Sequence, residues 1–202
     1  MRIQGYHDRI NHALAFAAKH HDQQVRRGTR SPYFTQPANV GLILTRYGCD
    51  DTTVIAGILH DVVEDSVREG HTREMLDRRI ADKFGPEILD RTLEVTQRRV
   101  NDQGIELSLD ERREDCLERL AGISETSRWV RAADTLHQAA TLLADLQRTV
   151  EPASVWSRFV AGRQATVAWY RRVNDRLREV GFNAPITEEL SEVVAALETW
   201  RD

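Results

Sequence analysis

The sequence contains little that would link the chain covalently or anchor it in a membrane. Its two cysteines, Cys49 and Cys116, lie far apart, with no second thiol near either. This spacing argues against a disulfide framework or a zinc–thiolate cluster, and it fits a reducing compartment. No window approaches about 18 unbroken apolar residues, and the first residues lack the apolar segment of a signal peptide. We therefore expect a soluble, cytoplasmic protein that does not associate with membranes.

Extended basic runs are also lacking, and the formal net charge of the 202-residue chain is −4. Duplex nucleic acid is bound by clustered Lys and Arg side chains, so it is not an expected partner. One absence is local: no Lys or Arg occurs from Tyr47 to Val67. Solvated helix faces normally carry both signs of charge, so the acids in this stretch need another explanation.

Helical periodicity extends over most of the chain, and strict alternation rich in β-branched residues does not occur, which predicts an all-α fold. We expect one domain over residues 1–202, with a core at about 10–145 and C-terminal helices at about 155–200. The polar stretch from Arg98 to Asp110 is expected to be a loop, and Asp50 or Asp51 to cap the third helix. The expected helices are roughly 6–24, 37–47, 51–65, 72–84, 86–98, 110–121, 127–149, 155–181 and 186–200.

Four polar residues with chemistry of their own lie in the third of these helices. At roughly 100° per residue, His60, Asp61, Glu64 and Asp65 share one face, beside a stripe of apolar residues. An imidazole next to a carboxylate suits a metal ion, and two further carboxylates suit work on a metal-bound water. The alternative is a solvated acidic face, but the missing cations favour a cation site.

A further acidic residue, Asp134, lies among small and apolar residues of a helix that is expected to pack inward. A buried carboxylate needs a partner, because burying an unpaired charge is unfavourable. Two partners are open at this point: an ion pair with a neighbouring Arg, or a metal shared with His60 and Asp61.

The order H-D-x-x-E-D, followed some seventy residues later by A-D-x-L, resembles the HD-domain metal-dependent phosphohydrolases. More narrowly, it is similar to the alarmone (ppGpp) hydrolase domain of RelA/SpoT enzymes and of their small stand-alone relatives. The matching residues are Ala15–Ala17, His21–Gln24, Arg26, Arg27, Pro32, Tyr33, Pro37, Ile58–Asp65, Phe84–Glu87, Val95, Thr96, Ala133 and Asp134.

The resemblance implies a reaction and a set of site residues. His60, Asp61 and Asp134 would bind a divalent metal, usually Mn²⁺ in this branch, while Glu64 and Asp65 would position and activate the attacking water. The substrate would be a small nucleotide, guanosine tetra- or pentaphosphate, which loses its 3′-pyrophosphate. The positions that match nucleotide-binding residues are Arg26, Arg27, Tyr33 and Gln138.

Two departures from the family pattern bear on the function. Gln36 stands where the family has a histidine ligand before proline, and an amide oxygen is a poorer donor to transition metals than imidazole. Gln138 stands where the family usually has asparagine, which affects the nucleotide contacts. Four other histidines are candidates to replace the missing ligand, or else surface and packing residues: His20, His21, His71 and His137.

Three functions therefore remain open: a ppGpp 3′-pyrophosphohydrolase, another nucleotide phosphohydrolase of the same superfamily, and a nucleotide-binding regulator with weakened catalysis. The oligomeric state is open as well. The amphipathic C-terminal helix, with Val193, Val194, Leu197 and Trp200, is expected either to cover the core or to form a contact in a homo-oligomer.

Overall fold

The computed structural model describes residues 6–26, 28–65, 72–101 and 103–201. Within these ranges the chain is all-α, as the sequence predicts, with ten helices and only isolated β-bridges. None of the described helices is long and apolar enough to cross a membrane. The chain forms two compact units, Met1–Thr96 and Gln97–Asp202, so the prediction of a single domain stays a prediction.

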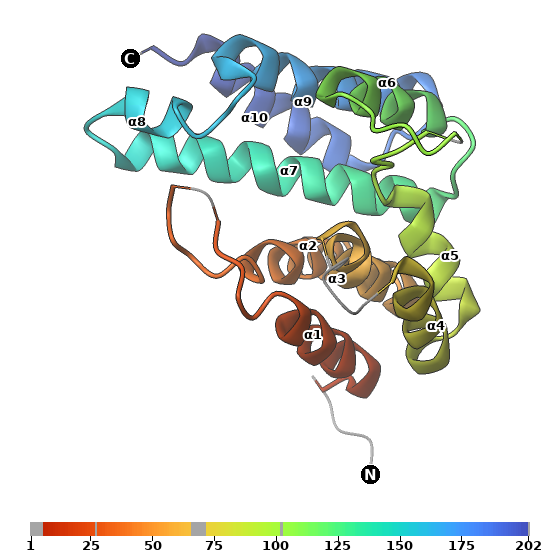
Figure 1. Ribbon diagram of the computed structural model, residues 1–202. Coiled ribbons are helices and arrows are strands. Elements are labelled where there is room, and N and C mark those ends of the chain that lie inside the picture. Colours follow the sequence, from red (N-terminus) through yellow and green to blue (C-terminus); the bar gives the residue numbers. More distant parts are fainter. Residues whose placement is uncertain (1–5, 27, 66–71, 102, 202) are drawn as a thin grey trace. The chain divides into compact units, whose positions relative to one another are not determined.

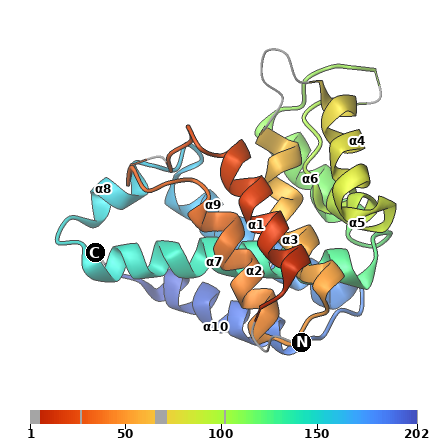
Figure 2. The same ribbon diagram turned by 90° about the horizontal axis from the view of Figure 1, so that it is seen from below.

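The first unit is built around α3 (Asp51–Asp65). This helix contacts all four other helices of the unit, and α1, α2 and α5 make the larger contacts (Figures 1 and 2). The four are α1 (Asp8–His20), α2 (Thr35–Arg46), α4 (Arg73–Phe84) and α5 (Pro86–Val95).

The central helix is buried on every side, because its neighbours surround it. Every residue from 53 to 63 is buried, so the polar face expected from the sequence does not meet solvent over this stretch. At its start, the Asp50 carboxylate accepts a hydrogen bond from the Thr53 backbone N–H at 2.8 Å, which confirms the expected N-cap.

Two glycines allow α2 and α3 to approach closely. A Cβ on Gly41 would lie 2.7 Å from Cγ1 of Ile58, and a Cβ on Gly57 would lie 2.4 Å from Cδ1 of Leu44. Both distances are shorter than any normal carbon–carbon contact, so a larger residue at either position would push the helices apart.

In the second unit the long helix α7 (Glu125–Arg148) packs against α8 (Pro152–Trp156), α9 (Gly162–Glu179) and α10 (Pro185–Thr199) (Figure 1). The remaining helix, α6 (Leu109–Arg119), packs on α9. Val194 and Leu197 of α10 are fully buried, so the C-terminal helix covers the core of its own unit, which is the first of the two roles expected for it.

One helix prediction is wrong. The expected helix at 155–181 is two helices, α8 and α9, separated by residues 157–161, and α9 begins at Gly162. Gly162 has φ +75°, a backbone conformation that other L residues rarely adopt. The predicted loop at 98–110 is correct to within two residues, since α6 begins at Leu109 after a capping box formed by Ser108 and Glu111.

Candidate functional site

His60 and Asp61 form a buried pair near the C-terminal end of α3. Their side chains are 2% and 6% exposed, so a solvated acidic face is excluded for these two residues. The His60 Nδ1 lies 2.7 Å from the Gly57 carbonyl oxygen, and a carbonyl only accepts, so Nδ1 carries the hydrogen. In a neutral imidazole the other nitrogen, Nε2, is then the acceptor and the metal-binding atom.

The position of that second nitrogen fits a metal ion. His60 Nε2 lies 3.0 Å from Asp61 Oδ1, and both atoms are acceptors when the ring is neutral. Two acceptors repel at this distance unless a proton or a cation lies between them. The other carboxylate oxygen, Asp61 Oδ2, is buried and accepts no hydrogen bond from the described part of the chain. These donor atoms fit a divalent cation such as Mn²⁺, which takes imidazole and carboxylate ligands.

Of the two predicted water-activating acids, Glu64 lies one helical turn after His60 and is half-buried. Residues four apart lie on one helix face, so Glu64 follows His60 along the same face of α3. Asp65 is the last residue of α3, and its side chain lies outside the described part of the structure.

Gln36, predicted to take the place of a histidine ligand, lies in the first turn of α2 and is half-buried. Its backbone N–H donates to the Tyr33 carbonyl at 2.9 Å. This hydrogen bond joins the predicted ligand to the loop that carries the predicted nucleotide contacts.

That loop, residues 24–33, is folded back on itself. The Tyr33 N–H donates to the Gln24 carbonyl at 2.9 Å, and the Arg26 N–H donates to the Ser31 carbonyl at 2.8 Å. Arg26 and Tyr33 are half-buried, while Arg27 lies outside the described residues. These two backbone hydrogen bonds therefore fix the base of the loop, and Arg26 lies at that base.

Two features at the loop were not predicted from the sequence: the contacts that His21 makes to it, and the backbone conformation of Arg30. His21 is 1% exposed. Its Nδ1 donates to the Gln24 Oε1 at 2.6 Å, and its ring packs on the Tyr33 ring at 5.0 Å between centroids. Arg30 is exposed and has φ +57°, which is rare for a residue with a Cβ. The sequence did hold a signal for Arg30: no Asp or Glu occurs from residue 23 to residue 49, so the arginines of the loop have no acid close in sequence.

In the second unit, Asp134 is 3% exposed on α7 and is held by two side chains of its own helix. Arg131 forms an ion pair with Oδ2 at 3.3 Å, and the Gln138 amide nitrogen donates to Oδ1 at 2.9 Å and to Oδ2 at 3.0 Å. The Arg partner that the sequence left open is therefore present. A carboxylate has about four lone-pair sites and can accept from several partners at once.

The predicted ligands do not form a recognised cluster in the described parts of the chain, where no group of three or more His, Cys, Asp or Glu is placed to hold a metal. His60, Asp61 and Gln36 belong to the first unit and Asp134 to the second. The complete ligand set stays a prediction. Of the histidines considered as replacements, His20 and His21 lie in the first unit, His137 is buried on α7, and His71 lies outside the described residues.

Neither thiol is a candidate nucleophile. Burial, reinforced by the neighbouring Asp50 carboxylate, raises the pKa of the Cys49 thiol to about 11. A thiol with this pKa is protonated at neutral pH and unreactive. Cys116 is buried, and both cysteines are free.

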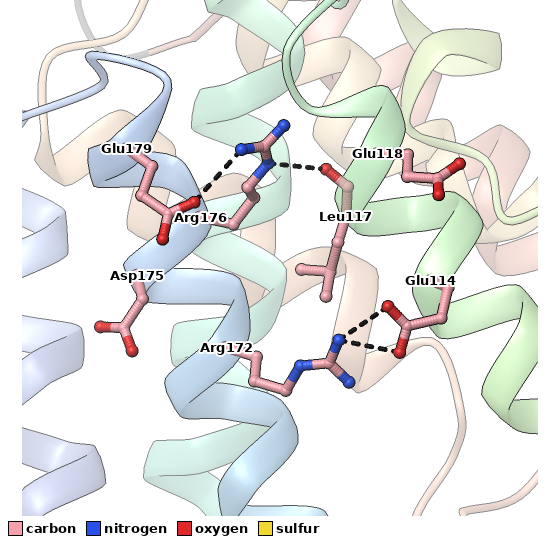
Figure 3. Close-up of a pocket in the computed structure, with 7 residues that line it drawn as sticks. All are labelled: Glu114, Leu117, Glu118, Arg172, Asp175, Arg176 and Glu179. Atoms are coloured by element: carbon pink, nitrogen blue, oxygen red, sulfur yellow. Dashed lines mark hydrogen bonds and ion pairs between the residues drawn. The ribbon is translucent and has the colours of Figure 1, made fainter.

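A groove of about 340 Å³ between α6 and α9 contains none of the predicted site residues (Figure 3). Arg172 pairs with Glu114 at 2.7 Å, and Arg176 pairs with Glu179 at 3.2 Å and donates to the Leu117 carbonyl at 3.1 Å. With Glu118 and Asp175 also present, acids outnumber arginines in the lining, so the groove does not attract a phosphate.

A comparison with protein families identifies the chain. The model of the HD domain matches residues 13–167, which is more than three quarters of the sequence. The chain belongs to the HD domain family. Hydrolases with HD domains depend on a divalent metal, in agreement with the donor atoms of His60 and Asp61.

The HD-family chain is similar to two kinds of curated protein. It is 32% identical to the guanosine-3′,5′-bis(diphosphate) 3′-pyrophosphohydrolase MESH1 of Drosophila melanogaster over 183 residues, 89% of each chain. It is also 32% identical to the GTP pyrophosphokinase rsh of Brucella ovis over 148 residues, which are 70% of this chain. That match spans only 18% of the much longer Brucella protein.

Two solved structures resemble this HD domain. One is a metazoan ortholog of SpoT that hydrolyses ppGpp, with a TM-score of 0.71 and 27% identity over 96% of this chain and 97% of that one. The other is lmo0812 from Listeria monocytogenes, with a TM-score of 0.64 and 29% identity over 79% of this chain and 96% of that one.

Proposed function

We propose that this protein is a metal-dependent phosphohydrolase that releases pyrophosphate from the 3′ position of ppGpp or pppGpp, leaving GDP or GTP. One observation carries the proposal: the match to a ppGpp 3′-pyrophosphohydrolase extends over 89% of both chains and includes His60 and Asp61. The buried approach of these two side chains, 3.0 Å apart, supports it.

His60 and Asp61 would hold the metal, and the sequence pattern adds Asp134 and Gln36 as further ligands. A bound divalent ion lowers the pKa of water and neutralises charge that develops on phosphate oxygens. We propose Mn²⁺, because the combination of imidazole and carboxylate suits it.

The acids of α3 would transfer the protons of the reaction. The water oxygen forms a bond to the phosphorus next to the ribose 3′ oxygen, and the bond between that phosphorus and the 3′ oxygen breaks. Glu64, assisted by Asp65, would take the proton from the attacking water and return one to the departing 3′ oxygen. GDP and pyrophosphate are the products when ppGpp is the substrate.

The loop before α2 would bind the nucleotide. Arg26 and Arg27 offer guanidinium groups suited to phosphate oxygens, and Tyr33 offers a ring at the fixed base of the loop. Because the partner is a small nucleotide, a duplex nucleic acid or a membrane is not part of the proposal. We further propose that the protein works in the cytoplasm, and that a homo-oligomer is compatible with this function.

Gln36 favours a second candidate, a nucleotide-binding regulator with weakened catalysis, because an amide binds transition metals less tightly than imidazole. Another nucleotide phosphohydrolase of the HD superfamily is the third. A nucleotide panel that includes ppGpp, pppGpp, GTP and dGTP separates these candidates by turnover and by binding.

The decisive test compares wild-type protein with Glu64→Gln, using Glu87→Gln on the exposed side of α5 as the matched control. We expect wild-type and control protein with Mn²⁺ to convert ppGpp to GDP and pyrophosphate, detected by anion-exchange chromatography. Glu64→Gln should keep the metal and lose about two to four orders of magnitude in turnover, as for other general bases. Tight ppGpp binding with no turnover of any nucleotide would establish the regulator instead.

A further inference from the structure

The environment of Asp134 is set by residues one turn before and one turn after it on α7. Arg131 lies at i−3, and Gln138 lies at i+4, where a side chain that tilts toward the helix N-terminus reaches back to residue i. The single amide nitrogen of Gln138 contacts both carboxylate oxygens, at 2.9 and 3.0 Å. The amide therefore fixes the rotation of the carboxylate as well as its position.

We propose that Gln138 is a positioning residue, which orients the Asp134 carboxylate for a divalent metal, and that it does not bind the nucleotide. This inference rests on the proposed function, because it takes Asp134 to be a ligand. It changes the role given to Gln138 by family resemblance, in which this position contacts the substrate.

Side-chain length is the physical basis of the difference. Gln has one methylene more than the Asn that is usual at this position in the family, and the extra carbon brings the amide nitrogen within hydrogen-bond distance of a carboxylate four residues earlier. The amide N–H that donates to Asp134 in this way is directed at the carboxylate, so the same N–H does not also donate to a ribose or phosphate oxygen. Hydrogen-bond partners of metal ligands fix ligand orientation, and their loss typically lowers metal affinity about 10- to 100-fold.

The test uses Gln138→Asn, Gln138→Ala and, as a control on the same helix, the exposed Gln147→Ala. Mn²⁺ affinity is measured by isothermal titration calorimetry without nucleotide. The KM for ppGpp is measured separately, at saturating Mn²⁺. We expect both Gln138 variants to bind Mn²⁺ about 10-fold or more weakly, with the KM unchanged, while Gln147→Ala matches wild type in both measurements.

Gln138→Asn best distinguishes a nucleotide contact from a hydrogen bond to Asp134. A nucleotide contact would be preserved or improved by the residue usual in the family, whereas a carboxylate clamp would be lost because the shorter amide does not reach Asp134. Unchanged Mn²⁺ affinity in this variant overturns the inference, whether or not the KM changes. A purely structural role is excluded if the Mn²⁺ affinity of the Gln138 variants falls while their unfolding temperature in EDTA equals that of Gln147→Ala.

The two levels of the proposal fail in different ways. Wild-type protein that binds no divalent metal contradicts the proposed function itself, and the inference with it. Wild-type protein that binds Mn²⁺ and hydrolyses ppGpp, with Gln138 variants of equal metal affinity, contradicts only the role of Gln138.

Discussion

Replacing Asp61 with asparagine should make the metal-free protein more stable while it removes metal binding. When the His60 ring is neutral, two acceptor atoms, His60 Nε2 and Asp61 Oδ1, lie 3.0 Å apart in the wild type, and Oδ2 is buried. The substituted asparagine would be nearly isosteric with the aspartate, and its amide could donate to Nε2. The repulsive pair would become a hydrogen bond, and a buried negative charge would be removed.

The magnitude follows from these two changes. A neutral buried hydrogen bond contributes about 0.5–1.5 kcal/mol, and relief of an unsatisfied buried group adds a similar amount. We therefore expect Asp61→Asn to stabilise the protein in EDTA by about 1–3 kcal/mol, which corresponds to a rise of roughly 2–12 °C in Tm for a chain of this size.

Metal should reverse this order. A ligand at about 1,000 times its Kd stabilises the folded state by about 4.1 kcal/mol, but only in a protein that still binds it. Loss of one ligand should weaken binding by at least about 100-fold, since a few ligands share the whole binding free energy. Wild type should therefore be the more stable protein in Mn²⁺, and Asp61→Asn the more stable one in EDTA.

Thermal and urea unfolding of both proteins in the two buffers measures this reversal, with the exposed Asp90→Asn on α5 as control. The control should differ from wild type by less than about 0.5 kcal/mol in either buffer. If Asp61→Asn is less stable than wild type in EDTA, or retains Mn²⁺ by elemental analysis, then the pair is not a metal site held ready by the fold.

Three further results are expected. Gln36→His should tighten Mn²⁺ binding and raise ppGpp hydrolysis at low metal concentration, because imidazole is the better donor; titrations that show neither gain would mean that the site is built around the amide. Arg26→Gln should raise the KM for ppGpp about 10- to 100-fold through loss of a charged hydrogen bond, with Arg46→Gln, an exposed arginine at the end of α2, unchanged in the same assay. Gly41→Ala should lower the free energy of unfolding by about 1–3 kcal/mol through overpacking, whereas Gly122→Ala, whose Cβ would be 3.9 Å from its nearest neighbour, should be nearly neutral in urea unfolding.

The bounds of α3 were predictable because its ends carry local signals. Asp50 supplies a cap, apolar residues recur at helical spacing from Val54 to Val63, and the predicted range 51–65 is the observed one. Prolines in the first turn marked the starts of α5 and α10 in the same way. The break between α8 and α9 was missed because helical periodicity continues through it, and only the backbone conformation of Gly162 reveals the turn.

The site was predictable as chemistry but not as geometry. His60 and Asp61 could be selected because their residue types suit a metal, yet the sequence left a solvated face open, since burial depends on helices that pack from elsewhere in the chain. Gln138 lies four residues after Asp134, a spacing at which the two side chains of a helix can form a hydrogen bond. Whether an amide bonds its own helix or a ligand is decided by the rotamer, which composition and spacing do not determine.

The distribution of charge in the first unit has a kinetic consequence. Residues 23–49 contain four arginines and no acid, and the next stretch, to residue 67, contains five acids and no Lys or Arg. Opposed fields of this kind orient a molecule that is itself charged before any contact forms, and they accelerate its arrival. A tetraphosphate nucleotide would approach with its phosphates toward the arginine loop, while a divalent cation would be drawn to the acids. Both association rates should fall as salt is added, because the screening length shortens to about 8 Å at physiological ionic strength.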